Sequence, residues 1–135
     1  MRQHASTKTW RLLAIDDNRD SAELVARAAG QCGYEGQYVL SPHAVRETVE
    51  RDVPDVITLD LGMPDFDGIQ ILLQLADMGF QGHLIIVSGQ SRLERERAVQ
   101  IAIKRGIRVP DHFAKPVPLH ALRSALIAIR NAEAA

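Results

Sequence analysis

The chain has 135 residues, of which 46% are hydrophobic, and its formal net charge is -1. This length and composition fit one globular domain with a hydrophobic core and exclude an intrinsically disordered chain. The balanced charge gives no indication of direct binding to nucleic acid or to a membrane surface, and the single cysteine, Cys32, excludes an internal disulfide bond.

Residues 1–9 are polar and lack the apolar stretch of a secretory signal. The apolar runs that follow are only a few residues long, far short of a membrane span. We therefore expect a cytoplasmic protein in which residues 1–9 form a flexible N-terminal tail.

Five short apolar runs, each suited to one strand, are spaced along the chain. Near-continuous apolar runs of this length are typical of strands that are covered on both faces of a parallel sheet. The predicted strands are residues 10–15, 37–40, 56–59, 84–87 and 109–113.

Helical patterns fill the intervals, because apolar residues recur there every three or four positions. Ser41-Pro42, Asp67 and the capping-box pattern from Ser91 to Glu94 predict helix starts. Glycines predict three helix ends. The recurring apolar residues are Ala22, Val25, Ala29, Cys32, Val45, Val49, Ile69, Leu72, Leu73, Ala76, Leu119, Leu122, Leu126 and Ile129, and the terminating glycines are Gly33, Gly79 and Gly106.

Strand and helix alternate five times, which predicts an α/β fold with a parallel sheet and helices on both faces. Chemistry in such folds collects at the carboxyl ends of the strands. Polar residues follow four of the five predicted strands, so we expect them to meet at one edge of the sheet. They are Asp16, Asp17, Asp60, Ser88 and Lys115.

These residue types suit magnesium-dependent phosphoryl transfer. Neighbouring carboxylates repel one another, and a hard dication such as Mg²⁺, which prefers oxygen ligands and bridges carboxylate to phosphate, relieves that repulsion. A lysine ammonium and a hydroxyl add charge neutralisation and a hydrogen-bond donor, which this reaction needs more than covalent machinery. A carboxylate can itself be the nucleophile and form an acyl phosphate.

Taken singly, each residue also has an ordinary structural explanation. Asp16 and Asp17 could be a favourable acidic pair at a helix N-terminus. Asp60 could be a loop aspartate, Ser88 a helix cap and Lys115 a solvated surface residue. Their occurrence at four separate strand ends favours a shared site.

The sequence Asp60-Leu61-Gly62-Met63-Pro64-Asp65-Phe66-Asp67-Gly68, together with Asp16-Asp17, Ser88-Gly89 and Lys115-Pro116, resembles the receiver domains of two-component response regulators, the chemotaxis-receiver-like family. The resemblance covers residues 10–131. It implies one doubly wound sheet with the flavodoxin-like strand order 2-1-3-4-5, five helices, and signalling without turnover of a separate substrate.

The resemblance also implies a role for each matching residue. Asp60 corresponds to the phosphorylated aspartate, and Ser88 and Lys115 correspond to the residues that contact the phosphoryl group. Asp16, Asp17, Asp60 and the backbone carbonyl of Gly62 would hold Mg²⁺. The Lys115–Pro116 peptide bond is expected to be cis. The phosphoryl donor would be a histidine kinase or a histidine phosphotransfer protein.

Two further features bear on switching. His112 lies where the family carries a residue that moves inward on activation together with the hydroxyl residue, here Ser88; a histidine there would make signalling sensitive to pH near neutrality. The alternative is a half-exposed strand residue. Lys115 follows Ser88 by 27 positions, a longer interval than is typical of receivers, and residues 92–108 within it are strongly charged. This segment is either a solvated helix face or a partner surface.

Two other functions remain as alternatives. A magnesium-dependent phosphohydrolase could use Asp60 as nucleophile, but the second aspartate that such sites place two positions later is Gly62 here. A flavodoxin-like nucleotide binder would need a glycine loop after the first strand, where this chain has Asp16-Asp17-Asn18. For a receiver, we expect output through an unknown partner or a missing output domain, mediated by the fourth helix, fifth strand and fifth helix.

Overall fold

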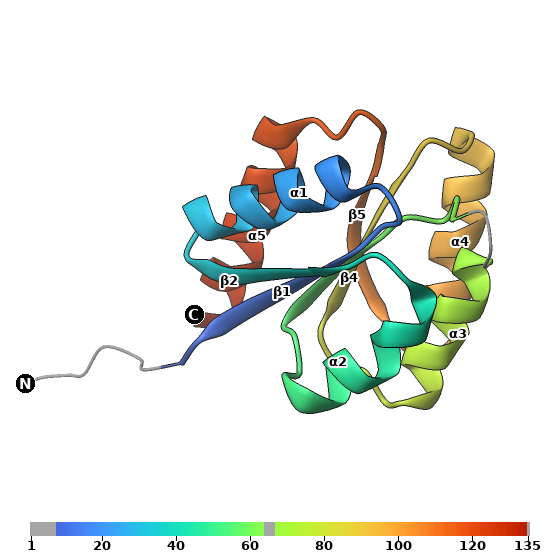
Figure 1. Ribbon diagram of the computed structural model, residues 1–135, viewed down its shortest axis with the longest axis horizontal. Coiled ribbons are helices and arrows are strands. Elements are labelled where there is room, and N and C mark those ends of the chain that lie inside the picture. The colour runs from blue at the N-terminus through green and yellow to red at the C-terminus, as the bar shows by residue number, and fades with distance from the viewer. Residues whose placement is uncertain (1–7, 64–66, 135) are drawn as a thin grey trace, which may run out of the picture.

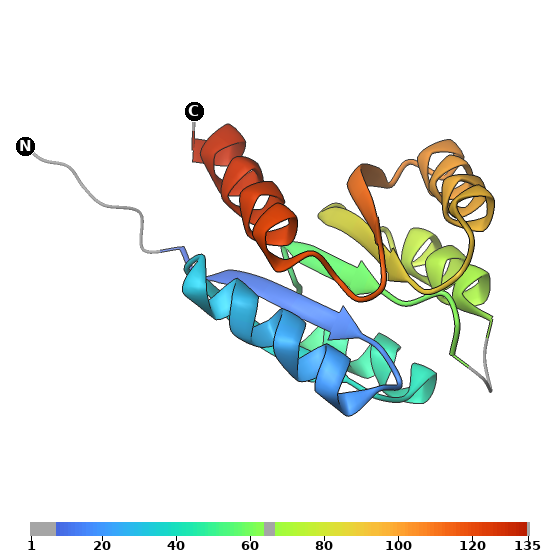
Figure 2. The same cartoon turned by 90° about the horizontal axis from the view of Figure 1, so that it is seen from above.

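The computed structural model describes residues 8–63 and 67–134 and contains a five-stranded parallel sheet in the order β2-β1-β3-β4-β5. Helices cover both faces of this sheet (Figures 1 and 2). The fold class and strand order predicted from the sequence are therefore confirmed. The elements are β1 (Trp10–Ile15), α1 (Arg19–Gln31), β2 (Tyr34–Val39), the short 3-10 helix η1 (Pro42–Ala44), α2 (Val45–Arg51), β3 (Val56–Leu59), α3 (Gly68–Asp77), β4 (His83–Ser88), α4 (Arg92–Lys104), β5 (Arg108–Ala114) and α5 (Leu119–Ala134).

The central strands contribute side chains to two separate cores, because successive residues of a strand point to opposite faces. In β4, Leu84 and Ile86 pack in the core under α2, α3 and α4, whereas Ile85 and Val87 pack in the core under α1 and α5. Figure 2 shows the two helical layers on either side of the sheet. Burial on both faces explains why these strands read as continuous apolar runs.

The predicted helix caps are present. Asp67 accepts a hydrogen bond from the backbone N–H of Ile69 at 2.9 Å, and Ser91 Oγ accepts one from Glu94 at 3.2 Å. The Glu94 carboxylate accepts from the Ser91 hydroxyl, not from the Ser91 backbone amide of a standard capping box. Ser41 caps the 3-10 turn η1, which precedes α2.

The three predicted helix ends coincide with left-handed glycines. Gly33, Gly79 and Gly106 have φ of 86°, 75° and 87° and follow the last turns of α1, α3 and α4. Glycine adopts this conformation without the steric cost that a Cβ would impose.

β2 was the least accurate prediction, because it begins at Tyr34 and ends at Val39 instead of spanning residues 37–40. The Tyr34 side chain is buried, and its hydroxyl donates to the Leu126 carbonyl at 2.7 Å. At Gly36 the Ala26 carbonyl oxygen lies 2.3 Å from where a Cβ would be, so α1 approaches the strand closely here. Tertiary contacts thus extend a strand through residues of weak strand propensity. β4 and β5 each extend one residue further at both ends than predicted.

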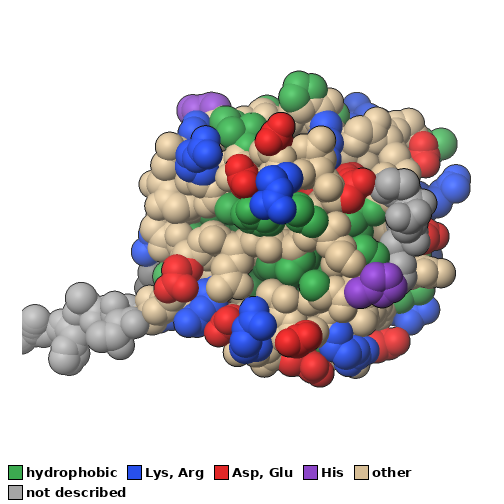
Figure 3. Space-filling model, viewed as in Figure 1, with side chains coloured by type: hydrophobic (Ala, Val, Ile, Leu, Met, Phe, Trp, Pro, Cys, Tyr) green, Lys and Arg blue, Asp and Glu red, His purple; other side chains and the backbone are tan. Residues whose placement is uncertain are grey.

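Residues 1–7 of the predicted N-terminal tail and residues 64–66 of the motif from Asp60 to Gly68 lie outside the described residues. Lys8 is described, and its ammonium lies 2.8 Å from the Asp55 carboxylate and 4.1 Å from the centre of the Trp10 ring. Within residues 8–63 and 67–134, no helix combines the length and apolar character needed to cross a bilayer. On the face drawn in Figure 3, acidic and basic side chains are interspersed.

Candidate functional site

The first two carboxylates of the site follow β1. The backbone N–H of Asp16 donates to the Val39 carbonyl of β2 at 3.2 Å, and the Asp16 carboxylate accepts from the backbone N–H of Asn18 at 2.9 Å. Asn18 in turn caps α1 by accepting from Ser21. These bonds hold the Asp16 side chain in a buried position, whereas Asp17 is exposed.

The third carboxylate follows β3. The backbone N–H of Asp60 donates to the Ile15 carbonyl at 2.9 Å, and its Oδ1 accepts from the backbone N–H of Gly62 at 3.0 Å. Asp16, Asp17 and Asp60 each present a carboxylate oxygen within 4.8 Å of the other two. The structure thus brings together the three aspartates that the sequence placed at the strand ends.

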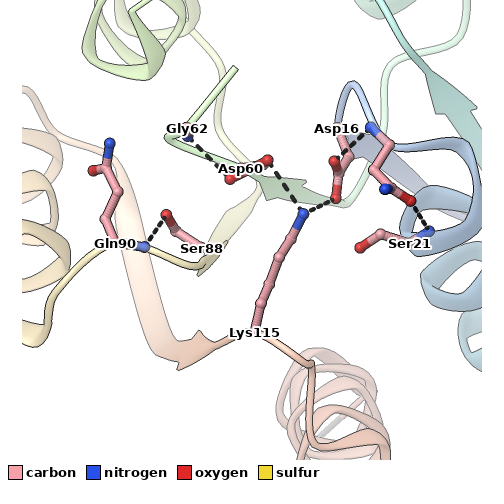
Figure 4. Close-up of polar contacts among 8 residues, drawn as sticks. Asp16, Ser21, Asp60, Gly62, Ser88, Gln90 and Lys115 are labelled. Atoms are coloured by element: carbon pink, nitrogen blue, oxygen red, sulfur yellow. Dashed lines mark hydrogen bonds and ion pairs between the residues drawn. The ribbon is translucent and has the colours of Figure 1, made fainter. Parts of the chain in front are cut away.

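Lys115 reaches this cluster from the end of β5. Its Nζ lies 2.7 Å from Asp16 Oδ2 and 3.2 Å from Asp60 Oδ2, between the two carboxylates (Figure 4). The Lys115–Pro116 peptide bond is cis, as the resemblance implies. The lysine side chain is therefore part of the cluster and not a solvated surface residue.

Burial and charge perturb both partners of this ion pair. Burial raises the pKa of the Asp60 carboxyl above its usual range, and the negative charge of Asp16 adds to the rise, while the Gly62 N–H and the Lys115 charge oppose it. Burial lowers the pKa of the Lys115 ammonium, but the hydrogen bonds and charges of Asp16 and Asp60 outweigh that effect and leave the pKa raised. The lysine is thus held in its charged form.

The donor set fits a hard dication. Three carboxylates gather at this edge and one ammonium contacts two of them, so the negative charge exceeds the positive charge that Lys115 supplies. Oxygen ligands of this kind suit Mg²⁺ better than softer metals. The group of potential metal ligands found within the described residues consists of these three aspartates, without a histidine.

Ser88 ends β4 beside this cluster and is fully buried. Its Oγ accepts from the backbone N–H of Gln90 at 3.1 Å, and its carbonyl accepts from the backbone N–H of Lys115 at 3.1 Å. Figure 4 shows Ser88, Asp60 and Lys115 around the same space. Among the described residues other than its chain neighbours, no atom lies within 4 Å of where a Cβ of Gly89 would be, so the segment after Ser88 borders open space.

His112 is a half-buried residue of β5, and its Nδ1 accepts a hydrogen bond from Nε of Arg95 at 3.4 Å. Sequence reasoning treated Arg95 only as one member of a charged segment. Its contact links α4 to β5 across 17 positions, and no local pattern in the sequence marks such a pairing.

A family model described as the response regulator receiver domain matches residues 12–127. This chain belongs to that family. Receiver domains are the phosphoacceptors of two-component systems, and the recognition made from the sequence motifs is confirmed.

Curated and solved relatives agree with this assignment. The chain is 28% identical to the response regulator MprA of Mycobacterium leprae over 88% of this chain and 50% of that protein. It is 24% identical to the sporulation initiation phosphotransferase F of Bacillus subtilis, over 86% and 90% of the two chains. A solved response regulator from Colwellia psychrerythraea superimposes with a TM-score of 0.78 at 26% identity, covering 93% of this chain and 99% of that one. The receiver spans about half the length of the MprA proteins that it matches.

Proposed function

We propose that Asp60 is the residue of this receiver domain that accepts the phosphoryl group. The observation that carries the proposal is the position of its carboxylate, which is buried at the sheet edge beside the Lys115 ammonium and the other two aspartates. A nucleophile for phosphoryl transfer needs positioning and neutralisation of the transferred charge, and this arrangement supplies both.

Asp16, Asp17 and Asp60, with the backbone carbonyl of Gly62, are the proposed ligands of Mg²⁺. When bound, the ion would supply positive charge for the oxygens of the transferred group. Asp16 and Asp60 also hold the Lys115 ammonium, at 2.7 Å and 3.2 Å. Positive charge would then reach the phosphoryl group from Lys115 as well.

In the proposed reaction, a carboxylate oxygen of Asp60 attacks the phosphorus of a phosphohistidine on a histidine kinase or a phosphotransfer protein. An O–P bond forms, the N–P bond breaks, and the released imidazole nitrogen takes up a proton. Lys115 stabilises the developing charge, and the Ser88 hydroxyl donates to a phosphoryl oxygen. The receiver catalyses its own modification and turns over no separate substrate.

Phosphorylation would add about 1.5 to 2 negative charges at Asp60. Ser88 would move toward the new oxygens and His112 would follow, which changes the surface formed by α4, β5 and α5. A shift from 1:99 to 99:1 between two arrangements requires roughly 5.5 kcal/mol of differential interaction. A few charge-assisted hydrogen bonds to a phosphoryl group are of that order. This surface is the proposed contact for the downstream partner or output domain.

Incubation with acetyl phosphate tests the proposal. Wild-type protein should become phosphorylated only when Mg²⁺ is present, and Asp60→Asn should abolish the reaction. Asp17→Asn should raise the Mg²⁺ concentration that is needed, whereas Asp20→Asn, an exposed acidic residue in the first turn of α1, should not. Modification of Asp60→Asn at the wild-type rate would refute the proposal.

A further inference from the structure

α4 carries most of the charged segment that the sequence singled out, and most of that charge faces solvent. Arg92, Glu94, Glu96 and Arg97 are exposed, and Arg92 pairs with Glu96 along the helix at 3.2 Å. Arg95 differs because its side chain is half-buried and turns toward the body of the protein. Both alternatives for this segment, a solvated helix face and a partner surface, therefore apply to these exposed residues, but not to the inward-facing Arg95.

The Arg95 guanidinium bonds to two segments that flank the phosphoacceptor site. Its Nη1 donates to the backbone carbonyl of Gln90 at 2.7 Å, and its Nε donates to Nδ1 of His112 at 3.4 Å. A guanidinium is planar and rigid, so one side chain fixes both directions at once. Arg95 thereby ties the loop after β4 to the ring on β5.

The contact with Gln90 extends to Ser88. The backbone carbonyl of Gln90 accepts a hydrogen bond from Arg95. The backbone N–H of the same residue donates to Ser88 Oγ at 3.1 Å (Figure 4). Gly89, which lies between Ser88 and Gln90, has no side chain and borders open space. Side-chain packing at Gly89 therefore does not restrain the loop. Arg95 is consequently an anchor for the segment that holds the Ser88 hydroxyl.

Under the proposed function, both segments that Arg95 contacts must move when Asp60 is phosphorylated. In the structure, Lys115 contacts the carboxylates of Asp16 and Asp60 directly. Movement of the Gln90 loop toward the site would strain the bond to Arg95. An inward swing of the His112 ring would break the bond to Nδ1.

We propose that Arg95 is a positioning residue that holds Ser88 and His112 in the unphosphorylated arrangement and so weakens the affinity of the site for a phosphoryl group. This inference rests on the proposed function. Because the protein must release the Arg95 contacts before it binds a phosphoryl group well, the apparent affinity is reduced by the fraction of molecules in which they are released.

The test compares the affinity of wild type and Arg95→Met for beryllofluoride in the presence of Mg²⁺, measured by amide NMR titration. Loss of a hydrogen bond from a charged donor shifts an equilibrium by roughly tenfold, so Arg95→Met should bind beryllofluoride roughly tenfold more tightly. The affinity of Arg95→Met for Mg²⁺ alone should match that of wild type, because Arg95 bonds to Gln90 and His112 and, within the described residues, to none of the proposed metal ligands.

Two further variants separate this role from general damage or loss of charge. Arg97→Met makes the same change on an exposed part of the same helix and should bind beryllofluoride as wild type does. Arg95→Lys keeps the positive charge but lacks the planar guanidinium that donates in two fixed directions. It should bind beryllofluoride with an affinity between those of wild type and Arg95→Met. In Arg95→Met without beryllofluoride, the ring resonances of His112 should lie part-way toward their positions in the wild-type complex.

Equal or weaker beryllofluoride binding by Arg95→Met would overturn the inference, as would tighter binding by Arg97→Met of the same size. Wild-type behaviour of Arg95→Lys would assign the effect to charge and also overturn the positioning role. Failure of the proposed function gives a different result, because wild type itself would then not bind beryllofluoride, or Asp60→Asn would bind it equally well.

Discussion

Asp17→Asn should stabilise the metal-free protein, although it removes a proposed metal ligand. Asp17 faces two carboxylates with oxygens within 4.8 Å. At that distance and in a water-like dielectric, each repulsion costs about 0.9 kcal/mol. Attraction between the Asp17 carboxylate and the Lys115 ammonium offsets part of this repulsion. The free energy of unfolding of Asp17→Asn should therefore exceed that of wild type by about 1 kcal/mol.

Urea unfolding followed by circular dichroism measures the effect. With a slope of about 2 kcal/mol per molar urea, the midpoint should rise by about 0.5 M. Mg²⁺ at ten times its Kd should stabilise wild type by about 1.4 kcal/mol, because it binds only the folded state. Asp17→Asn should gain much less, so the order of stability of the two proteins should reverse when Mg²⁺ is added.

Asp20→Asn is the matched control. It removes the same charge from the first turn of α1, where an acidic residue is favourable, and should not stabilise the protein. Sodium chloride at matched ionic strength should not reproduce the gain produced by Mg²⁺. If Asp17→Asn were less stable than wild type without metal, or gained as much from Mg²⁺, the proposed crowding of carboxylates around a cation site would be wrong.

Three other predictions test the fold by the same unfolding measurement. Both Gly33 and Gly79 have positive φ, which costs an alanine about 1 to 2 kcal/mol. Gly33→Ala should lose more stability than Gly79→Ala, because the new Cβ would also displace the Arg130 guanidinium from its 2.7 Å hydrogen bond to the Cys32 carbonyl. Equal losses would mean that this hydrogen bond contributes nothing to stability. Burial, and then the charge of Arg108, lower the pKa of His83 from 6.5. The unfolded chain therefore binds this proton more readily than the folded protein does. The contribution of His83 to stability is consequently lost as pH falls below 6.5. His83→Gln should therefore reduce the loss of stability between neutral and acidic pH. If the pH dependence of the free energy of unfolding were the same as in wild type, the lowered pKa of His83 would not be its cause. Leu122→Ala in the core under α1 and α5 should cost about 2 to 5 kcal/mol, whereas Ile127→Ala on the exposed side of α5 should cost far less.

The strands buried on both faces were the easiest elements to predict. β3 has the predicted bounds because Val56 to Leu59 are apolar or β-branched throughout and are buried. β2 was harder because Glu35 and Gly36 have weak strand propensity, and their conformation depends on pairing with β1 and on the close approach of α1.

The candidate site followed from topology, because parallel strands bring their carboxyl ends to one edge. That rule predicts the cluster of Asp16, Asp17 and Asp60 without side-chain coordinates. It does not predict that Lys115 binds Asp16 more closely than Asp60, which depends on side-chain geometry. The contacts of Arg95 could not be predicted either, since exposed and inward-facing arginines of one charged helix look alike in a sequence.

The central claim is that Asp60 accepts the phosphoryl group with the help of Mg²⁺. Peptide mass mapping after incubation with acetyl phosphate tests it most directly. The label should lie on the peptide that contains Asp60, should require Mg²⁺, and should disappear in Asp60→Asn. A label on a histidine or on Ser88, or one that forms equally well without Mg²⁺, would contradict this account.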